Sequence, residues 1–298
     1  MPRLIVGTNL NDSHISFIDH YINDTQNGTY DHGVLFGATS VDYLIGDPGG
    51  ISNVPQGAGV LIAAGDDFLH GGHSHANDIL FGDVLYTDTL AAAMGIGTNP
   101  GAGWAVFDLL EGGQSLIDPG WTRADTMDYI KNNSEELATE SGGRLGGNDL
   151  LFGSAGNDVI FGQEGNDIIG GYWGNDTLYG GSGADTFVFG QHEIFDFNVY
   201  SIVSTLYPTT YHDGIDTIKD FNLAEGDRLD ISHVLFDYNA AADDILDFVS
   251  ASEAAGNTTI RFDVDGPGTQ MSPVTAIILE GVTGLDLTLA TNDGNPIV

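Results

Sequence analysis

The chain has 298 residues and no cysteine, and its 43 acidic residues against 7 Lys and Arg give a formal net charge of -36. This charge disfavours binding to nucleic acid and anionic lipid, and the lack of cysteine excludes disulfides and zinc–thiolate sites. Hydrophobic residues make up 41% of the chain, enough for a core. Compaction nevertheless requires that many carboxylates be neutralised, and multivalent metal ions suit that purpose.

Residues 1–64 are expected to form a β-rich segment that caps or starts the repeat structure described below. The opening MPRLIVGTNLNDSH lacks the basic and long apolar stretches of a secretory leader. No run of about 18 apolar residues suggests a membrane span. VDYLIGD, with Asp42 and Leu44, is interpreted as a degenerate early repeat.

Residues 65–83 contain the first clear repeats. GDDFLHGG places Gly65, Asp67 and Leu69 at alternate positions, and ANDILFG places Asp78 and Leu80 in the same way. The spacing of 11 between them predicts a bulged turn that holds His73 and His75. Together with His70, these histidines are expected to be exposed turn residues, with a zinc or nickel site as the alternative.

Residues 84–143 have a different composition and are predicted to form a helical insertion carried on the repeats. Thr122 followed by Asp125 resembles a capping box. The predicted helices span Trp104–Leu110 and Thr122–Thr139, and the apolar stripe of the second, Met127, Ile130 and Leu137, is expected to pack against the repeats.

Residues 144–190 hold five consecutive nine-residue units without an insertion: RLGGNDLLF, GSAGNDVIF, GQEGNDIIG, GYWGNDTLY and GGSGADTFV. The eighth position is always apolar. The fourth position is always glycine, namely Gly147, Gly156, Gly165, Gly174 and Gly183, and the sixth is always aspartate, namely Asp149, Asp158, Asp167, Asp176 and Asp185.

This repeat predicts a parallel β-roll in which each unit is half a coil, a glycine-rich turn followed by a short strand. Alternate units then stack along the same edge about 4.8 Å apart. Unneutralised acidic turns at this spacing would repel one another. Calcium accepts six to eight oxygen ligands at about 2.4 Å and is favoured over magnesium, which requires a smaller octahedron.

About five calcium ions in total, arranged in two files, are therefore predicted. One file runs along Asp67, Asp149, Asp167 and Asp185, and the other runs along Asp78, Asp158 and Asp176.

Residues 191–298 leave the repeat. DTIKDF, DRLDIS, TTIRFDV and TAIILEGV predict short strands in a β-rich cap. A roll that ended without a cap would expose an unpaired edge and an open apolar end.

The repeat resembles the RTX family of calcium-binding nonapeptide proteins. LIGDPGG, GGRLGGNDLLFGSAGND and GADTFVFG followed by DTIKDFNLAEGDRLDIS resemble the C-terminal region of large repetitive biofilm adhesins. The resemblance implies a secreted Gram-negative protein, exported by an ABC exporter, a membrane-fusion protein and an outer-membrane channel. It places the type I secretion signal at roughly 259–298 and the adhesive modules upstream of Met1. A monomer is expected.

No catalytic motif accompanies the repeat. HEIFD at His192 lacks the second histidine of a zinc-protease helix, and no GxSxG nucleophile elbow occurs in a strand-to-helix context. The units also lack the threonine ladder of an ice-binding solenoid. We therefore expect a non-enzymatic folding and secretion module, with the RTX module of a secreted hydrolase and a direct ligand-binding adhesive domain as alternatives. Tyr172 and Trp173 are expected to shield the roll against the inserted helices.

Overall fold

A computed structural model describes residues 3–6, 33–36, 42–46, 67–71, 77–98, 101–139, 146–190, 193–196, 201–204, 214–232, 234, 238, 243–263, 266, 273–285 and 287. Gly65, His73 and His75 lie outside the described residues. Among the residues that are described, no helix combines the length and the apolar composition needed to cross a bilayer.

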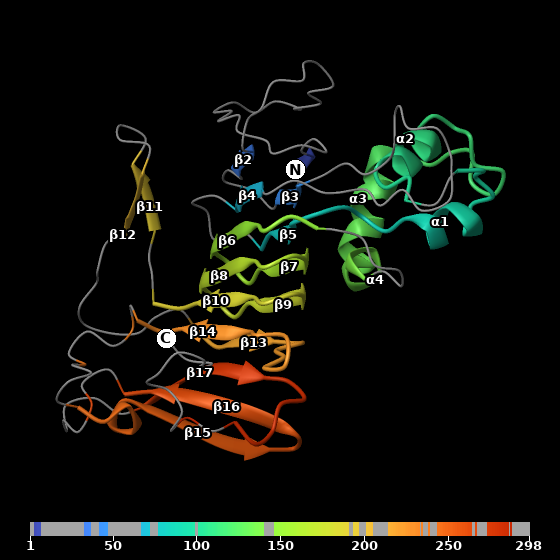
Figure 1. The fold of residues 1–298 in the computed structure, drawn as a ribbon. Helices are drawn as coiled ribbons and strands as arrows, with labels where there is room; N and C mark the ends of the chain where they lie inside the picture. Colours follow the sequence, from blue (N-terminus) through green and yellow to red (C-terminus); the bar gives the residue numbers. More distant parts are fainter. Residues whose placement is uncertain are drawn as a thin grey trace.

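Two parallel sheets face each other and form a β-roll, as predicted (Figure 1). Successive strands of the roll alternate between the two sheets, so each pairs with the next but one strand of the roll, and the hairpin at 193–204 lies outside this order. One sheet contains β2 (Gly33–Phe36), β4 (Asp67–His70), β6 (Leu150–Ala155), β8 (Ile168–Trp173), β10 (Thr186–Val188) and β14 (Arg228–Asp230). The other contains β1 (Arg3–Val6), β3 (Asp42–Ile45), β5 (Ile79–Phe81), β7 (Val159–Glu164), β9 (Thr177–Ser182) and β13 (Asp216–Ile218).

The core between the sheets is a column of the eighth-position side chains. All of them are fully buried, and they form one cluster because alternate strand residues point to opposite faces of a sheet. The column consists of Leu44, Leu69, Leu80, Leu151, Ile160, Ile169, Leu178, Phe187, Ile218 and Leu229. Leu44 belongs to it, so the repeat at Asp42 is a genuine coil of the roll.

The second sheet continues into an antiparallel end. β17 (Val274–Leu279) pairs in parallel with β13 and antiparallel with β16 (Asn257–Phe262), which pairs with β15 (Val249–Ala254) after the short helix η1 (Ile245–Asp247). These strands cover one end of the roll (Figure 1). A separate hairpin joins β11 (Glu193–Asp196) and β12 (Ser201–Ser204). The expectation that the whole region after 190 forms a cap needs correction, because β13 and β14 extend the roll itself.

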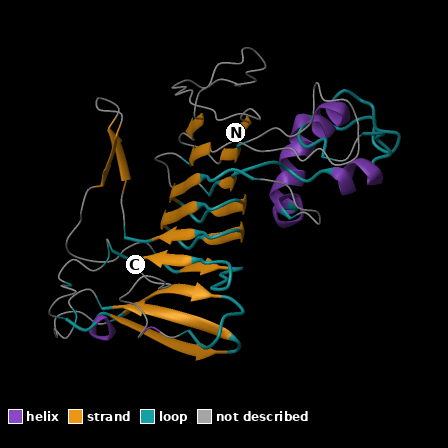
Figure 2. Ribbon diagram, in the orientation of Figure 1, coloured by secondary structure: helices purple, strands orange, loops and turns teal. Residues whose placement is uncertain are grey.

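Four helices lie in the described residues between β5 and β6 and stand to one side of the roll (Figure 2). They are α1 (Asp88–Ala93), α2 (Ala105–Glu111), α3 (Arg123–Asn132) and α4 (Ser134–Ala138). α1 was not predicted, and the helix predicted over 122–139 is broken at Asn133 into α3 and α4. The capping box at Thr122 is present, with the Asp125 carboxylate accepting from the Thr122 N–H at 2.8 Å.

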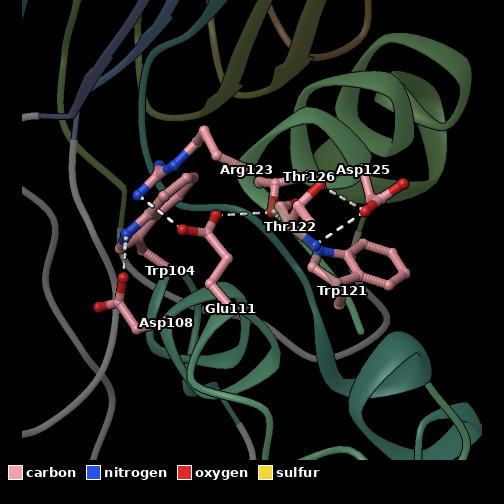
Figure 3. A network of polar contacts seen from close by, with 8 residues as sticks. All are labelled: Trp104, Asp108, Glu111, Trp121, Thr122, Arg123, Asp125 and Thr126. Atoms are coloured by element: carbon pink, nitrogen blue, oxygen red, sulfur yellow. Dashed lines mark hydrogen bonds and ion pairs between the residues drawn. The ribbon is translucent and has the colours of Figure 1, made fainter. Parts of the chain in front are cut away.

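The helices have their own core and polar contacts. Ile130 and Leu137 are buried in one cluster with Phe81 and Phe161 of the roll, and Met127 is partly buried against it. Glu111 of α2 links α2 to α3: it accepts from the Thr126 hydroxyl at 2.7 Å and pairs with Arg123 at 3.0 Å (Figure 3). The insertion is thus a packed unit that covers one outer face of the roll.

Candidate metal centre

The turns at the two edges of the roll carry two ladders of buried aspartates. The backbone N–H of every Asp except the last in its ladder donates to Oδ1 of the Asp one coil further along the same edge, at 2.7–3.1 Å. One ladder contains Asp67, Asp149, Asp167, Asp185 and Asp227, and the other contains Asp78, Asp158, Asp176 and Asp216. The seven aspartates selected from the sequence thus lie on the edges expected for them, and all nine are at most 3% exposed.

The second oxygen of the central carboxylates has no conventional partner. Oδ2 of Asp158, Asp167, Asp176 and Asp185 is buried and receives no hydrogen bond. A buried carboxylate oxygen left without a donor is unfavourable by about 1–3 kcal/mol or more. A bound cation would satisfy these oxygens.

Carbonyl oxygens converge on the same points as Oδ2. A Cβ added to Gly162 would lie 2.4 Å from Asp167 Oδ2 and 2.5 Å from the Gly180 carbonyl oxygen. Beside Gly71, the corresponding distances are 2.6 Å to Asp78 Oδ2 and 2.3 Å to the Gly153 carbonyl oxygen. Only glycine leaves this space open to a ligand.

The donor set fits calcium. Within the described part of the chain, no three His, Asp or Glu side chains gather as a metal-binding group. An ion at a turn would therefore have one or two carboxylates and complete its shell with backbone carbonyls. Calcium accepts such mixed oxygen shells, whereas zinc prefers nitrogen and sulfur ligands and magnesium holds its water.

The fourth-position glycines bring neighbouring turns into close contact. Gly165 has φ 138°, and a Cβ there would lie 1.5 Å from the Gly147 carbonyl oxygen. Gly174 has φ 148°, and its Cβ would lie 1.4 Å from the Gly156 carbonyl oxygen. Any side chain would push the coils apart, which explains the glycine at this position.

Burial dominates the electrostatics of the ladders. It raises the pKa of Asp158 to about 9 and that of Asp167 to about 10, with the carboxylates of neighbouring coils adding to the effect. Burial also raises the pKa of Asp185 to about 7, and Asp227 and Asp220 contribute. The roll therefore buries acids that resist ionisation unless a positive charge accompanies them.

The fifth-position asparagines form a second, outer ladder. The Asn166 N–H donates to Asn148 Oδ1 at 2.8 Å, and the Asn175 N–H donates to Asn157 Oδ1 at 2.8 Å. Here the later coil donates to the earlier one, the reverse of the Asp ladders. Each turn is thus tied to its neighbours in both directions, independently of any ion.

Three buried carboxylates were missed by the sequence reasoning. Asp216 and Asp227 extend the two ladders, and Asp83 accepts from the Gly147 N–H at 2.9 Å. The sequence GIDTI at 214–218 has glycine, aspartate and an apolar residue at the repeat spacing and could have revealed Asp216. In EGDRL, glycine directly precedes Asp227, whereas the repeat has its glycine two positions before the aspartate. Asp83 does not stand in any recognisable repeat.

Two expectations about side chains beside the site were wrong. His70 is 2% exposed on β4 and is not an exposed turn residue. Tyr172 packs on Phe152, with ring centroids 5.5 Å apart, on the sheet opposite to the one that contacts the helices, while Trp173 remains 37% exposed. Neither aromatic side chain shields the roll against the insertion.

Comparison with known proteins supports the calcium interpretation. Residues 145–178, 157–187 and 174–191 match the RTX calcium-binding nonapeptide repeat. The AlgE6R3 subunit of the mannuronan C5-epimerase from Azotobacter vinelandii, a solution structure, is 25% identical over 52% of this chain and 69% of its own, with a TM-score of 0.23. No curated protein matches the chain. Residues 145–191 are thus RTX calcium-binding nonapeptide repeats, and they form the middle of a parallel β-roll.

Proposed function

We propose that this chain is a non-enzymatic module for calcium-dependent folding and type I secretion, at the C-terminus of a large extracellular adhesin of a Gram-negative bacterium. The observation that carries the proposal is the pair of ladders of buried aspartates, whose central Oδ2 atoms have no hydrogen-bond partner. Such ladders are unstable in a calcium-poor cytosol and stable where calcium is abundant.

The ladder aspartates would hold the ions together with turn carbonyls such as those of Gly153, Gly162 and Gly180. The first ladder has four neighbouring pairs and the second has three. One ion for each pair gives about seven, compared with about five expected before Asp216 and Asp227 were recognised. Calcium supplies the positive charge that lets these carboxylates ionise inside the roll.

Calcium binding and folding are then one equilibrium, because the ligands of each ion come from different coils and meet only in the folded state. Before export, repulsion among the acidic turns keeps the chain expanded and able to pass a narrow channel. Outside the cell, calcium drives the roll to close. The C-terminal roll emerges first and would hinder the chain from sliding back.

The secretion and adhesin parts of the proposal rest on the repeats, the charge and the sequence resemblance. RTX repeats typify proteins secreted by Gram-negative bacteria, and the net charge of -36 suits a chain that folds only with cations. The sequence resemblance to biofilm adhesins supports an adhesin as the parent protein and a secretion signal within 259–298. The partners would be calcium and the three-component exporter, and the module would be a monomer.

A secretion assay tests this proposal. A reporter fused upstream of residues 259–298 should reach the medium of a cell that has the cognate exporter, and deletion of these residues from the whole chain should retain it inside. A cytosolic marker controls for lysis. Equal export with and without residues 259–298 would show that the signal lies elsewhere.

A further inference from the structure

The helical insertion interrupts one nonapeptide between its second and third positions. Gly82 and Asp83 precede the insertion, Gly146 and Gly147 follow it, and without residues 84–145 the sequence would read GDGGNDLLF. The coil keeps its register across the interruption, because the Asp67 N–H donates to Asp149 Oδ1 at 2.7 Å. We call the turn formed by residues 82–83 and 146–149 the split turn.

The split turn contains the same pair of converging oxygens as the intact turns. A Cβ on Gly82 would lie 2.2 Å from Asp149 Oδ2 and 2.6 Å from the Gly162 carbonyl oxygen. In the intact turn from Gly162 to Asp167, the two ends are five positions apart, whereas Gly82 and Asp149 are 67 positions apart. If the insertion were a flexible loop, closing it would weaken calcium binding here by about 50-fold relative to an intact turn.

One side chain of the roll holds both ends of the insertion. Gln163 accepts from the Asp83 N–H at 2.9 Å through Oε1, and its Nε2 donates to the Val84 carbonyl at 2.7 Å and to the Ala138 carbonyl at 3.3 Å. Gln163 is buried and lies in the next turn of the roll, one position after Gly162. It therefore connects the start and the end of the insertion to a turn with ladder carboxylates.

An aromatic ladder provides the apolar part of the contact. The rings of Phe81 and Phe161 are stacked with centroids 5.1 Å apart, and those of Phe161 and Tyr179 are stacked at 4.6 Å. The helices cover this ladder with buried side chains that include Phe107 and Ile130. Docking of the insertion therefore requires several stacked coils, which exist only when the roll is folded.

We propose that docking of the helical insertion closes the split calcium turn, so that the insertion and this calcium site stabilise each other. The inference rests on the proposed calcium-dependent folding and adds its regulation: one site of the ladder is filled together with the ordering of the helices. Because such coupling is reciprocal, calcium tightens the docking as much as docking tightens calcium binding.

The test uses the full chain with Trp173→Phe, which leaves Trp104 and Trp121, both in the insertion, as the only tryptophans. Fluorescence then follows the helices, far-UV circular dichroism follows the roll, and native mass spectrometry counts bound calcium. The variant is Gln163→Gly. Gln163 has φ 80° and pairs in register with Gly181, so glycine suits the backbone while the contacts to the insertion are lost.

We expect Gln163→Gly to raise the calcium midpoint of the fluorescence change by about tenfold or more, given the loss of two buried hydrogen bonds and one partly buried hydrogen bond. The midpoint of the roll signal should shift less than twofold, and at intermediate calcium one ion fewer should be bound. Tyr179→Phe is the matched control, because it removes an exposed contact to Glu135 between the same two units and should shift both midpoints less than twofold.

A second variant perturbs the helical insertion instead of the roll. Phe107→Ala damages the buried core of the insertion without touching the turns, and it too should cost one bound ion at intermediate calcium. Full calcium occupancy in both variants, or equal shifts of the fluorescence and roll signals in Gln163→Gly, would overturn the coupling. A parent chain that neither binds calcium nor folds with it would instead contradict the proposed function.

Discussion

Asp167→Asn should change stability in opposite directions with and without calcium. Asp167 lies in the middle of its ladder, where Oδ1 accepts from the Asp149 N–H at 2.8 Å and its own N–H donates to Asp185 Oδ1 at 2.9 Å. Asparagine has the same shape and keeps an oxygen to accept the first bond. It removes the negative charge and replaces Oδ2, the atom proposed to bind calcium.

Without calcium, the negative charge of Asp167 destabilises the folded roll. Burial raises the pKa of Asp167 to about 10 from 3.8, so the folded state at pH 7 must hold a proton that the unfolded chain has released. The folded state is therefore stabilised by protonated Asp167 in full below pH 3.8, and this contribution to the free energy of unfolding is lost as the pH rises from 3.8 towards 10. At pH 7 the loss is about 4 kcal/mol as an upper limit, because relaxation of the turns reduces it. Asparagine avoids this loss and should stabilise the calcium-free roll.

With calcium, the same substitution removes a charged ligand from two proposed ions. The calcium midpoint of folding should therefore rise by about tenfold or more. A tenfold rise corresponds to a loss of about 1.4 kcal/mol of calcium-binding free energy. Both arms can be measured by circular dichroism, as the calcium midpoint at pH 7 and, in chelator, as the pH at which β structure is half lost. Asp128→Asn, exposed on α3, removes the same charge and should do neither. The reasoning predicts that both midpoints rise, the calcium midpoint because the calcium-bound roll is less stable and the chelator pH midpoint because the calcium-free roll is more stable; a fall or no change in either would refute it.

Further predictions concern the turns as a group. Gly162→Ala should raise the calcium midpoint by about tenfold, because its Cβ fills the space between Asp167 Oδ2 and the Gly180 carbonyl, whereas Gly97→Ala, with open space around it, should have no effect. In chelator, β structure should increase from pH 8 to pH 5, since burial raises the pKa of Asp158 to about 9; in calcium the trend should reverse, because the ions bind the deprotonated form. Asp227→Asn should lower the ion count in native mass spectrometry by about one.

The repeat was sufficient to predict the roll because each of its positions has a single physical role. Apolar residues at the eighth position could only face inward, and Leu151, Ile160 and Leu178 are fully buried. The carboxylates followed from the same periodicity, since alternate units must share an edge. Asp216 was missed although GIDTI at 214–218 keeps the repeat spacing, because this single copy stands apart from the five consecutive units. Asp227 was missed because its segment has no intact repeat, so strand pairing there is set by tertiary contacts.

The placement of the helices could not be predicted in the same way. Phe81, Phe161 and Tyr179 occupy the ninth position of every second unit, which makes one outer face aromatic, but nothing in the sequence states what covers it. α1 has six residues and no side-chain cap, so its local signal is weak. His70 was misassigned because a histidine near glycines looks like a turn residue, whereas register places it on a strand opposite Phe152.

A calcium-bound crystal structure with anomalous scattering tests the central claim most directly. Ions should lie between neighbouring ladder aspartates on both edges, about 2.4 Å from Oδ2 and from the turn carbonyls, and the pair Asp149 and Asp167 should share one. Fewer than three ions between the turns of residues 144–188 in a calcium-saturated crystal would contradict the account.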